Sequence, residues 1–320
     1  MLRDAYLDQL AYALGDRAET VEQAVARGVT RSGIQGFREG GFAQHHVCSA
    51  GVSAYDLARR AVEQIRIRPQ EIDALIYATA LPGNACLGDP GAFARTRDVK
   101  DLMHFAASEL QAEFGFSHAS VFGLDQQACT GALGAMRLAR SLIAAEPDVR
   151  SVLCVTADRF PGDALYEQAY NLISDGAAAC VVSARRSGFR ILACHAITNG
   201  ALARASDDET VGTFFNYALA AIRGALSKAG LGIDGIDWIV PQNTHAKAWR
   251  ILAGQLGFDP ARIYFPALGT AGHVISADNL INLKALAGSG SLRPGETVLL
   301  FMAGYGLNWQ CVILERVDDE

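Results

Sequence analysis

The chain has 320 residues, a mass of 34.0 kDa and a hydrophobic share of 50%, enough for a large buried core or two fused core units. A net charge of −6 and a pI near 5.7 argue against a nucleic-acid-binding surface, which would be basic. Acidic residues near the N-terminus and the lack of a long uncharged apolar run predict a cytoplasmic protein with no membrane span.

Short apolar, β-branched runs bounded by Gly, Asp or Pro predict buried strands, with segments of helical period between them. The expected strands cover residues 74–79, 151–156, 178–183, 238–240, 298–302 and 311–314. The expected helices cover residues 53–65, 99–114, 132–145, 214–229 and 246–256. Because strands and helices alternate, we predict an α/β fold with a covered sheet. The glycine- and proline-rich stretch from Pro82 to Met103 is expected to be a loop insertion that lines a binding tunnel or a dimer interface.

One helix–loop–strand pattern occurs twice. The apolar positions from Leu57 to Ile76 match those from Ala221 to Val240 at a constant offset, and both segments carry an Ile-Asp pair before the strand. A chance match between two amphipathic helices is the alternative. We predict two similar halves, residues 1–185 and 186–320, with the active site between them.

The first chemical feature is Cys129, in Asp125-Gln-Gln-Ala-Cys-Thr-Gly131 just before an apolar helical stretch. A helix N-terminus presents unpaired N–H groups and a partial positive charge, which favour a reactive thiolate. The alternative is a buried small hydrophobe, the role expected of the other six cysteines. An odd cysteine count without paired spacing predicts no disulfide framework. No metal-ligand spacing occurs either, and we expect no metal.

Downstream, His273 lies in a glycine-flanked loop and Asp278 follows five residues later. On one continuous helix these side chains would point about 140° apart, so a shared site needs His273 in the loop and Asp278 in the first helical turn, with Ser276 as a helix cap. The alternative makes Asp278 a helix-start charge only. A turn containing Gly304 and Gly306 ends a predicted strand, and such turns let backbone N–H groups approach a ligand, as an oxyanion hole requires.

Together these stretches resemble the thiolase superfamily, specifically β-ketoacyl-ACP synthase III and its relatives, almost end to end. The matching pieces occur in the family's order: Arg31-Ser-Gly-Ile-Gln-Gly-Phe-Arg38, Ile72-Asp-Ala-Leu-Ile-Tyr-Ala-Thr79, Gln127-Ala-Cys-Thr-Gly131, Ser174-Asp-Gly-Ala177, Asp237-Trp-Ile-Val-Pro241 and Gly304-Tyr-Gly-Leu-Asn-Trp309. The resemblance implies a duplicated five-layer α-β-α-β-α fold, normally a homodimer. It also implies that Cys129 is the acyl-accepting nucleophile and that the N–H groups of Cys129 and Gly306 hold the oxyanion.

Two family motifs are altered. Decarboxylating members have Pro-His-Gln-Ala-Asn after that strand and Gly-Asn-Thr-Ser later, whereas this chain has Pro241-Gln-Asn-Thr-His245 and Gly272-His-Val-Ile275. Gln242 therefore replaces the catalytic His, and His273 replaces the Asn. Gln242 cannot carry a positive charge or shuttle protons, but an imidazole near the thiolate and backed by Asp278 forms a Cys-His-Asp triad. Such a replacement is similar to that of relatives in specialised metabolism that transfer acyl groups to a sugar hydroxyl, an amine or another acceptor.

The leading hypothesis is an acyltransferase that takes an acyl group from a CoA or carrier-protein thioester and passes it to a small-molecule acceptor activated by His273. Carbon–carbon condensation and a non-catalytic partner of a second synthase-like chain are the alternatives. No cofactor beyond the thioester is expected. Candidate substrate contacts are Gln242, Asn243, Thr244, His245 and Asn308, with a structural role the stronger interpretation for His245. Candidate contacts to CoA phosphates or a carrier protein are Arg31, Arg38, Lys247 and Arg250, with solvated surface charge as the alternative.

Overall fold

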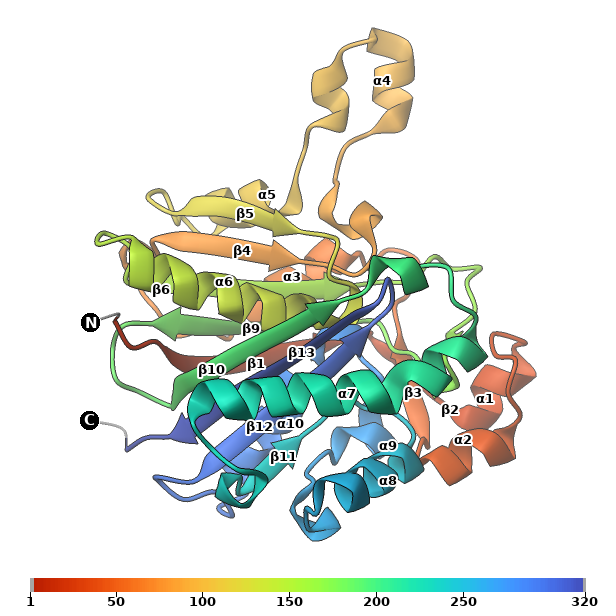
Figure 1. Cartoon of the computed structure of the whole chain (residues 1–320). Helices are drawn as coiled ribbons and strands as arrows, with labels where there is room; N and C mark the ends of the chain where they lie inside the picture. Colours follow the sequence, from red (N-terminus) through yellow and green to blue (C-terminus); the bar gives the residue numbers. More distant parts are fainter. Residues whose placement is uncertain (1–2, 319–320) are drawn as a thin grey trace.

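The computed structural model describes residues 3–318 and is built on a nine-stranded mixed sheet with helices on both faces (Figure 1). The strand order is β11-β12-β13-β10-β1-β9-β6-β4-β5. The bounds are β1 (Tyr6–Leu14), β4 (Ala74–Ala78), β5 (Ser120–Leu124), β6 (Ser151–Asp158), β9 (Gly176–Ser183), β10 (Phe189–Thr198), β11 (Trp238–Val240), β12 (Thr297–Gly304) and β13 (Asn308–Arg316).

The sheet repeats one pattern. Strands β1-β9-β6-β4 pair antiparallel, antiparallel and then parallel, and strands β10-β13-β12-β11 pair in the same sequence. The two sets are joined through β1 and β10, which share the register pairs Tyr6↔Arg190 and Leu7↔Phe189. Residues 185 and 186, the expected boundary between the halves, lie in the connection between β9 and β10. The helix–strand repeat recognised in the sequence corresponds to α3 (Ala54–Val62) before β4 and α7 (Asp207–Ala229) before β11.

Side-chain alternation along the strands divides the core into layers. Ile76 and Cys154 face a central cluster that contains α6 (Gly131–Ala145) and α10 (Asp278–Gly288). Their neighbours Leu75 and Leu153 face the opposite side, against α3 and α5 (Ala106–Glu113). In the C-terminal half, β12 and β13 pack outward against α7 and α8 (Ala246–Leu256). The layers run helix, sheet, helix, sheet, helix, as the predicted five-layer α/β fold requires.

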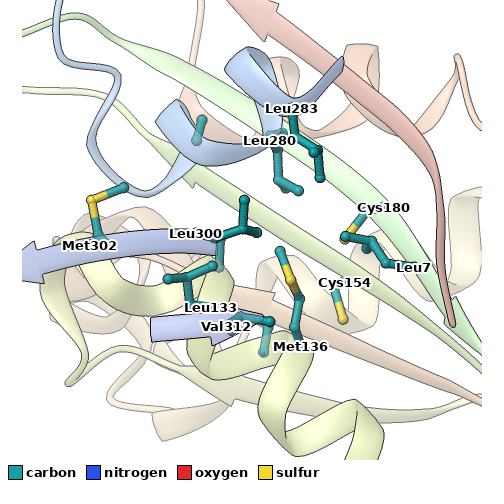
Figure 2. Close-up of a cluster of buried hydrophobic side chains, with 14 of the residues drawn as sticks. Leu7, Leu133, Met136, Cys154, Cys180, Leu280, Leu283, Leu300, Met302 and Val312 are labelled. Atoms are coloured by element: carbon teal, nitrogen blue, oxygen red, sulfur yellow. The ribbon is translucent and has the colours of Figure 1, made fainter. Parts of the chain in front are cut away.

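The central layer joins the two halves. Figure 2 shows Met136 of α6 and Leu280 and Leu283 of α10 among strand side chains from both half-sheets, including Cys180 and Leu300. These residues are at most 2% exposed. Because burying a large apolar side chain contributes roughly 1.5–3 kcal/mol, this layer fixes α6 and α10 against each other. The starts of these two helices carry the chemical groups described below.

Local sequence signals set several helix starts. Ser53, just before α3, forms a capping box with Asp56 in the first turn of that helix, and Ser206 does the same with Glu209 in α7. Small elements lie around the ends of the strands: α1 (Val21–Ala26), α2 (Ile34–Gly40), α9 (Ala267–Ala271) and the ribbons β2 (Arg17–Thr20) with β3 (Gln44–Val47) and β7 (Glu167–Gln168) with β8 (Asn171–Leu172). None of the helices within residues 3–318 is long and apolar enough to cross a membrane.

An excursion between β4 and α5 projects from the body, with α4 (Pro90–Thr96) at its tip (Figure 1). The helix predicted over residues 99–114 is wrong in its first part, because residues 99–102 form a 3₁₀ turn and α5 begins at Ala106. Phe105 instead pairs with Cys86 in an isolated β-bridge that closes the base of the excursion. Val99 and Met103 are 56% and 59% exposed, so the apolar periodicity here does not mark a buried helical face.

Candidate active site

Cys129 lies in a 3₁₀ turn (Ala128–Thr130) directly before α6, at the mouth of a helix as predicted. Ala128 has a φ of +44°, which is uncommon for a residue with a side chain and marks a sharp turn. The turn is held from both sides: the Thr130 hydroxyl donates to the Gln127 carbonyl at 2.6 Å, and the Ser276 hydroxyl donates to the Ala128 carbonyl at 3.0 Å. Ser276 therefore stabilises the nucleophile turn, and the expectation that it caps α10 is wrong because that helix has no side-chain cap.

The glycine turn packs against Cys129 through Gly304. A Cβ atom at Gly304 would lie 3.0 Å from the Cys129 nitrogen and 3.0 Å from the Gln127 carbonyl oxygen, so only glycine fits without displacing the turn. The Cys129 N–H donates to no acceptor among residues 3–318. Gly306 has a φ of +101°, and a Cβ there would meet no atom within 4 Å. Gly304 and Tyr305 border the cavity and Gly306 does not, so the oxyanion role predicted for the Gly306 N–H stays a prediction.

His273 and Asp278 are brought together as predicted, with His273 in a loop and Asp278 as the first residue of α10. The His273 Nδ1 and Asp278 Oδ2 atoms are 2.5 Å apart, and the two side chains are 2% and 0% exposed. Main-chain bonds fix the loop, because the His273 N–H donates to the Leu172 carbonyl and the Ser174 N–H donates to the His273 carbonyl, both at 2.8 Å. With Nδ1 bonded to Asp278, Nε2 is the ring nitrogen that can exchange a proton with a reactant.

The surroundings of His273 favour its charged form. Burial lowers the pKa of its imidazole, but the charge and hydrogen bond of Asp278 and the interaction with the Cys129 side chain outweigh burial and raise it to about 10. A positive charge on the His273 imidazole would stabilise negative charge that develops on the Cys129 sulfur, as in other cysteine nucleophiles paired with histidine.

Asn243 is hydrogen-bonded to the Asp278 carboxylate and does not border the cavity. Its N–H donates to Asp278 Oδ2 at 2.8 Å, and its Nδ2 donates to the Gly272 carbonyl at 2.8 Å. Asn282 donates in turn to the Asn243 side-chain oxygen at 2.8 Å. Asn243 is fully buried, so its predicted role as a substrate contact is wrong, and it is instead a positioning residue for the Asp278 carboxylate.

Cys129 and His273 border one cavity with a volume of about 340 Å³. Most of its wall is aromatic or aliphatic, and the larger side chains are Tyr170, Val211, Phe214, Phe215, Ile251, Tyr305, Leu307 and Trp309. The polar part of the wall is formed by Gln168, Asn171, Thr210, Gln242, Thr244, His245 and Lys247. No residue of the excursion borders this cavity in the single chain, so its expected place along a tunnel or at a dimer interface stays a prediction.

Gln242, Thr244 and His245 reach the cavity, as expected of possible substrate contacts. His245 also caps α8, accepting the Lys247 N–H at its Nδ1 atom, in line with a structural role. Asn308 is 4% exposed, accepts a hydrogen bond from the Thr198 hydroxyl at 2.6 Å and does not border the cavity. Its predicted role as a pocket liner is therefore wrong, because its side chain is bound to Thr198 outside the cavity wall.

The four candidate cations divide into two pairs. Arg31 lies 3.5 Å from Asp207 and Arg38 lies 2.7 Å from Glu22, so both already have a carboxylate partner. Lys247 borders the cavity, and Arg250 is exposed one helical turn further along α8. Neither has an ion-pair partner within residues 3–318, which leaves Lys247 and Arg250 as the freer anion contacts.

Sequence reasoning missed much of the pocket wall. Asn171 lies three residues before the recognised Ser174-Asp-Gly motif, and Tyr305 and Trp309 lie within the recognised glycine turn. Both motifs therefore indicated the right segments, but they did not indicate which side chains border the cavity. Phe214 and Phe215 are part of the helical periodicity of α7 and gave no separate signal. Five of the six other cysteines are buried as expected, but Cys86, at the base of the excursion, is exposed.

Two family models match the chain: 3-oxoacyl-[acyl-carrier-protein] synthase III over residues 125–200 and the C-terminal model of the same family over residues 226–316. Together they span just over half of the chain and contain Cys129, His273 and Asp278. The chain belongs to the 3-oxoacyl-[acyl-carrier-protein] synthase III family.

Curated relatives carry the synthase III name. The β-ketoacyl-[acyl-carrier-protein] synthase III of Paramagnetospirillum magneticum is 29% identical over 310 aligned positions, covering 88% of this chain and 87% of the relative. The synthase III structure from Aquifex aeolicus matches with a TM-score of 0.77 and 19% identity over 97% of this chain and 99% of that one. The structure of the acyltransferase ChlB3 matches with a TM-score of 0.81 and 19% identity over 98% of both chains. These likenesses confirm the thiolase-like fold predicted from the sequence.

Proposed function

We propose that the protein is an acyltransferase that loads an acyl group from a CoA or carrier-protein thioester onto Cys129 and transfers it to a hydroxyl, amine or related acceptor in specialised metabolism. The observation that carries this proposal is the shared cavity of Cys129 and His273, with Asp278 bound to the far side of the imidazole at 2.5 Å. The thioester donor supplies the only activated group that this reaction needs.

In the first step the Cys129 sulfur attacks the thioester carbonyl, the donor's carbon–sulfur bond breaks and the departing thiolate takes the proton of His273. The unpartnered Cys129 N–H, beside the turn at Gly304, is placed to stabilise the oxyanion. The product is acyl-Cys129 with a neutral imidazole.

In the second step the acceptor loses its proton to His273 Nε2 and forms a bond to the acyl carbon, while the bond from that carbon to the Cys129 sulfur breaks. The thioester form of Cys129 has no charge, so one of the groups that raise the pKa of His273 is removed, and the imidazole becomes a better proton acceptor. General-base assistance of this kind accelerates transfer by roughly 10²–10⁴.

Carbon–carbon condensation is the second candidate, and the synthase names of the curated relatives favour it. In that reaction Gln242 would donate a hydrogen bond to an enolate and His273 would stabilise or form the carbanion. Gln242 argues against decarboxylation because a neutral amide stabilises a developing negative charge less than an imidazolium does. A non-catalytic partner of another synthase-like chain is a third candidate, which the complete triad disfavours.

Intact-mass measurement with a panel of acyl-CoA and acyl-carrier thioesters tests the proposal in wild type, Cys129→Ala and His273→Ala. We expect wild type to gain acyl mass, Cys129→Ala to gain none, and His273→Ala to gain it more slowly and then fail to release it to alcohols or amines. Release of CO₂ and a β-keto product from malonyl thioester would favour condensation. Loss of neither step in His273→Ala would refute the triad.

We further propose that the chain is a homodimer. Strand β5 is at the edge of the sheet with Val121 38% exposed, and the neighbouring excursion exposes Val99, Met103 and Phe105. An exposed strand edge beside apolar side chains is suited to pairing with another chain. Light scattering should give about twice the mass of one chain, and a monomer at micromolar concentration would contradict the proposal.

A further inference from the structure

Two buried amides present only donors to the cavity. Gln242 is 6% exposed and its Oε1 atom accepts the Ala303 N–H at 3.0 Å. Asn171 is 5% exposed and its Oδ1 atom accepts the Thr244 hydroxyl at 2.8 Å. Both residues border the cavity. Neither amide nitrogen has an acceptor among residues 3–318, and neither is among the fully buried atoms that lack a partner. Each therefore offers N–H groups that need an oxygen atom as a partner.

The cavity wall has no negative charge to bind a cation. Within residues 3–318 no Asp or Glu borders the cavity, and Lys247 is the charged residue at its wall apart from the Cys129–His273 pair. Asp278 lies behind His273, with both oxygens occupied by Asn243, His273 and Val274. Asp208 does not border the cavity and accepts a hydrogen bond from the hydroxyl of the cavity residue Tyr170 at 2.6 Å. An ammonium group entering the cavity would lose its water without gaining a carboxylate partner.

The rest of the wall suits an uncharged ring or chain. Phe214, Phe215 and Trp309 provide apolar faces in the same cavity as the amide donors. A ligand that satisfies both parts of the wall has one apolar face and two or more oxygen atoms at its edge.

We propose that the acceptor is a neutral polyhydroxylated molecule with an apolar face, attacked through one hydroxyl while Gln242 and Asn171 bind a second oxygen. This inference rests on the proposed acyl transfer and narrows its acceptor from hydroxyl or amine to hydroxyl. The hydroxyl proton moves to His273, the oxygen–acyl bond forms and the acyl–sulfur bond of Cys129 breaks, so the product is an ester and the free enzyme is restored.

A variant that changes the charge at position 242 tests whether the acceptor is a hydroxyl compound, and it keeps the hydrogen bond from the Ala303 N–H that positions this side chain. In Gln242→Glu a carboxylate oxygen still accepts the Ala303 N–H, but the outward N–H donors become a negatively charged oxygen. The same change at the second amide is Asn171→Asp, and it serves if the first variant does not fold. Gln255→Glu, at an exposed position of α8 outside the cavity, is the matched control for added charge.

The assay uses isolated acetyl-Cys129 enzyme and follows loss of acetyl mass with trans-1,2-cyclohexanediol, cyclohexanol and trans-1,2-diaminocyclohexane, each corrected for the rate with His273→Ala. We expect wild type to acetylate the diol about fivefold to tenfold faster than cyclohexanol, since one added hydrogen bond contributes about 1 kcal/mol, and to acetylate the diamine more slowly than either. In Gln242→Glu the advantage of the diol should disappear and the diamine rate should rise, whereas Gln255→Glu should behave as wild type.

The outcomes separate this inference from the proposed function. Diamine acetylation as fast as that of the diol in wild type, or an unchanged diol-to-diamine ratio in both Gln242→Glu and Asn171→Asp, would overturn the inference while leaving acyl transfer intact. If the acyl-enzyme reacts with malonyl thioester to give CO₂ and a β-keto product but with no alcohol or amine, the proposed function fails and this inference fails with it.

Discussion

Asp278→Asn is the substitution that separates the charge of the triad from its geometry. In the native site Oδ2 accepts from His273 Nδ1 at 2.5 Å and from the Asn243 N–H at 2.8 Å, while Oδ1 accepts from the Val274 N–H at 2.6 Å. Every position around the carboxylate thus faces a donor, and the amide NH₂ of Asn has no suitable place. Placed towards Val274, it leaves a buried N–H without an acceptor at a cost of about 1–3 kcal/mol. Placed towards His273, it forces Nδ1 to accept, which moves the proton to Nε2 and blocks the base.

The variant should also reverse the charge state of His273. Burial lowers the pKa of His273, and without the charge of Asp278 burial should dominate. The pKa of the imidazole should then fall from about 10 to below its ordinary value of 6.5. Imidazole NMR signals, assigned with His273→Ala, follow this titration, and intact-mass kinetics follow release of the acyl group. We expect release to fall by about 10²–10⁴ with the fold retained. Release within threefold of wild type, together with an unchanged titration, would refute the role of Asp278.

Three further results are expected. Gly304→Ala should slow acylation about tenfold or more by displacing the Cys129 turn. Gly306→Ala should strain its own turn and have a smaller effect on acylation. Equal effects of the two variants would contradict the packing of Gly304 against Cys129. Asn243→Ala should slow acyl release about tenfold with little change in acylation, while Asn308→Ala, a buried amide away from the cavity, should change neither rate. The pKa of His273 is raised on folding, so its contribution to stability is complete below pH 6.5 and is lost as the pH rises to about 10. Urea unfolding should show wild type losing stability relative to His273→Ala by up to about 1.4 kcal/mol per pH unit in that window, and parallel curves would contradict the raised pKa.

Much of the fold could be predicted because its signals are local and repeated. Buried strands such as β6 and β9 are continuous apolar runs, and the offset between the helices before β4 and β11 indicated a duplication that the two matching strand orders display. Strands β1 and β10 were missed because their alternation is mixed: β1 is only partly buried and is interrupted by Gln9 at φ +56°. Spacing alone predicts a helix over part of the excursion because it does not reveal whether an apolar residue is buried.

The candidate catalytic residues were accessible to sequence reasoning because they lie beside turns that need particular small residues. Gly176 shows the limit, since a Cβ there would lie 2.2 Å from Val274, a contact between distant segments that no local pattern indicates. The errors at Asn243 and Asn308 have the same origin. Both lie beside residues of the site in sequence, but Asn243 turns towards Asp278 and Asn308 towards Thr198. Motif proximity predicted the segment, and only packing determines the direction of each side chain.

The two departures from the family motifs are physically consistent with each other. Position 242 must accept the Ala303 N–H, and an amide does so while still donating into the cavity, whereas an imidazolium has no acceptor atom at all. Position 273, in contrast, is adjacent to a carboxylate that is already oriented by main-chain N–H groups of residues 243 and 274, so an imidazole there gains charge and a fixed tautomer from bonds that the backbone supplies. A neutral donor at 242 and a titrating base at 273 are therefore the side chains that these environments favour, and the proposed removal of a proton from the acyl acceptor uses that combination.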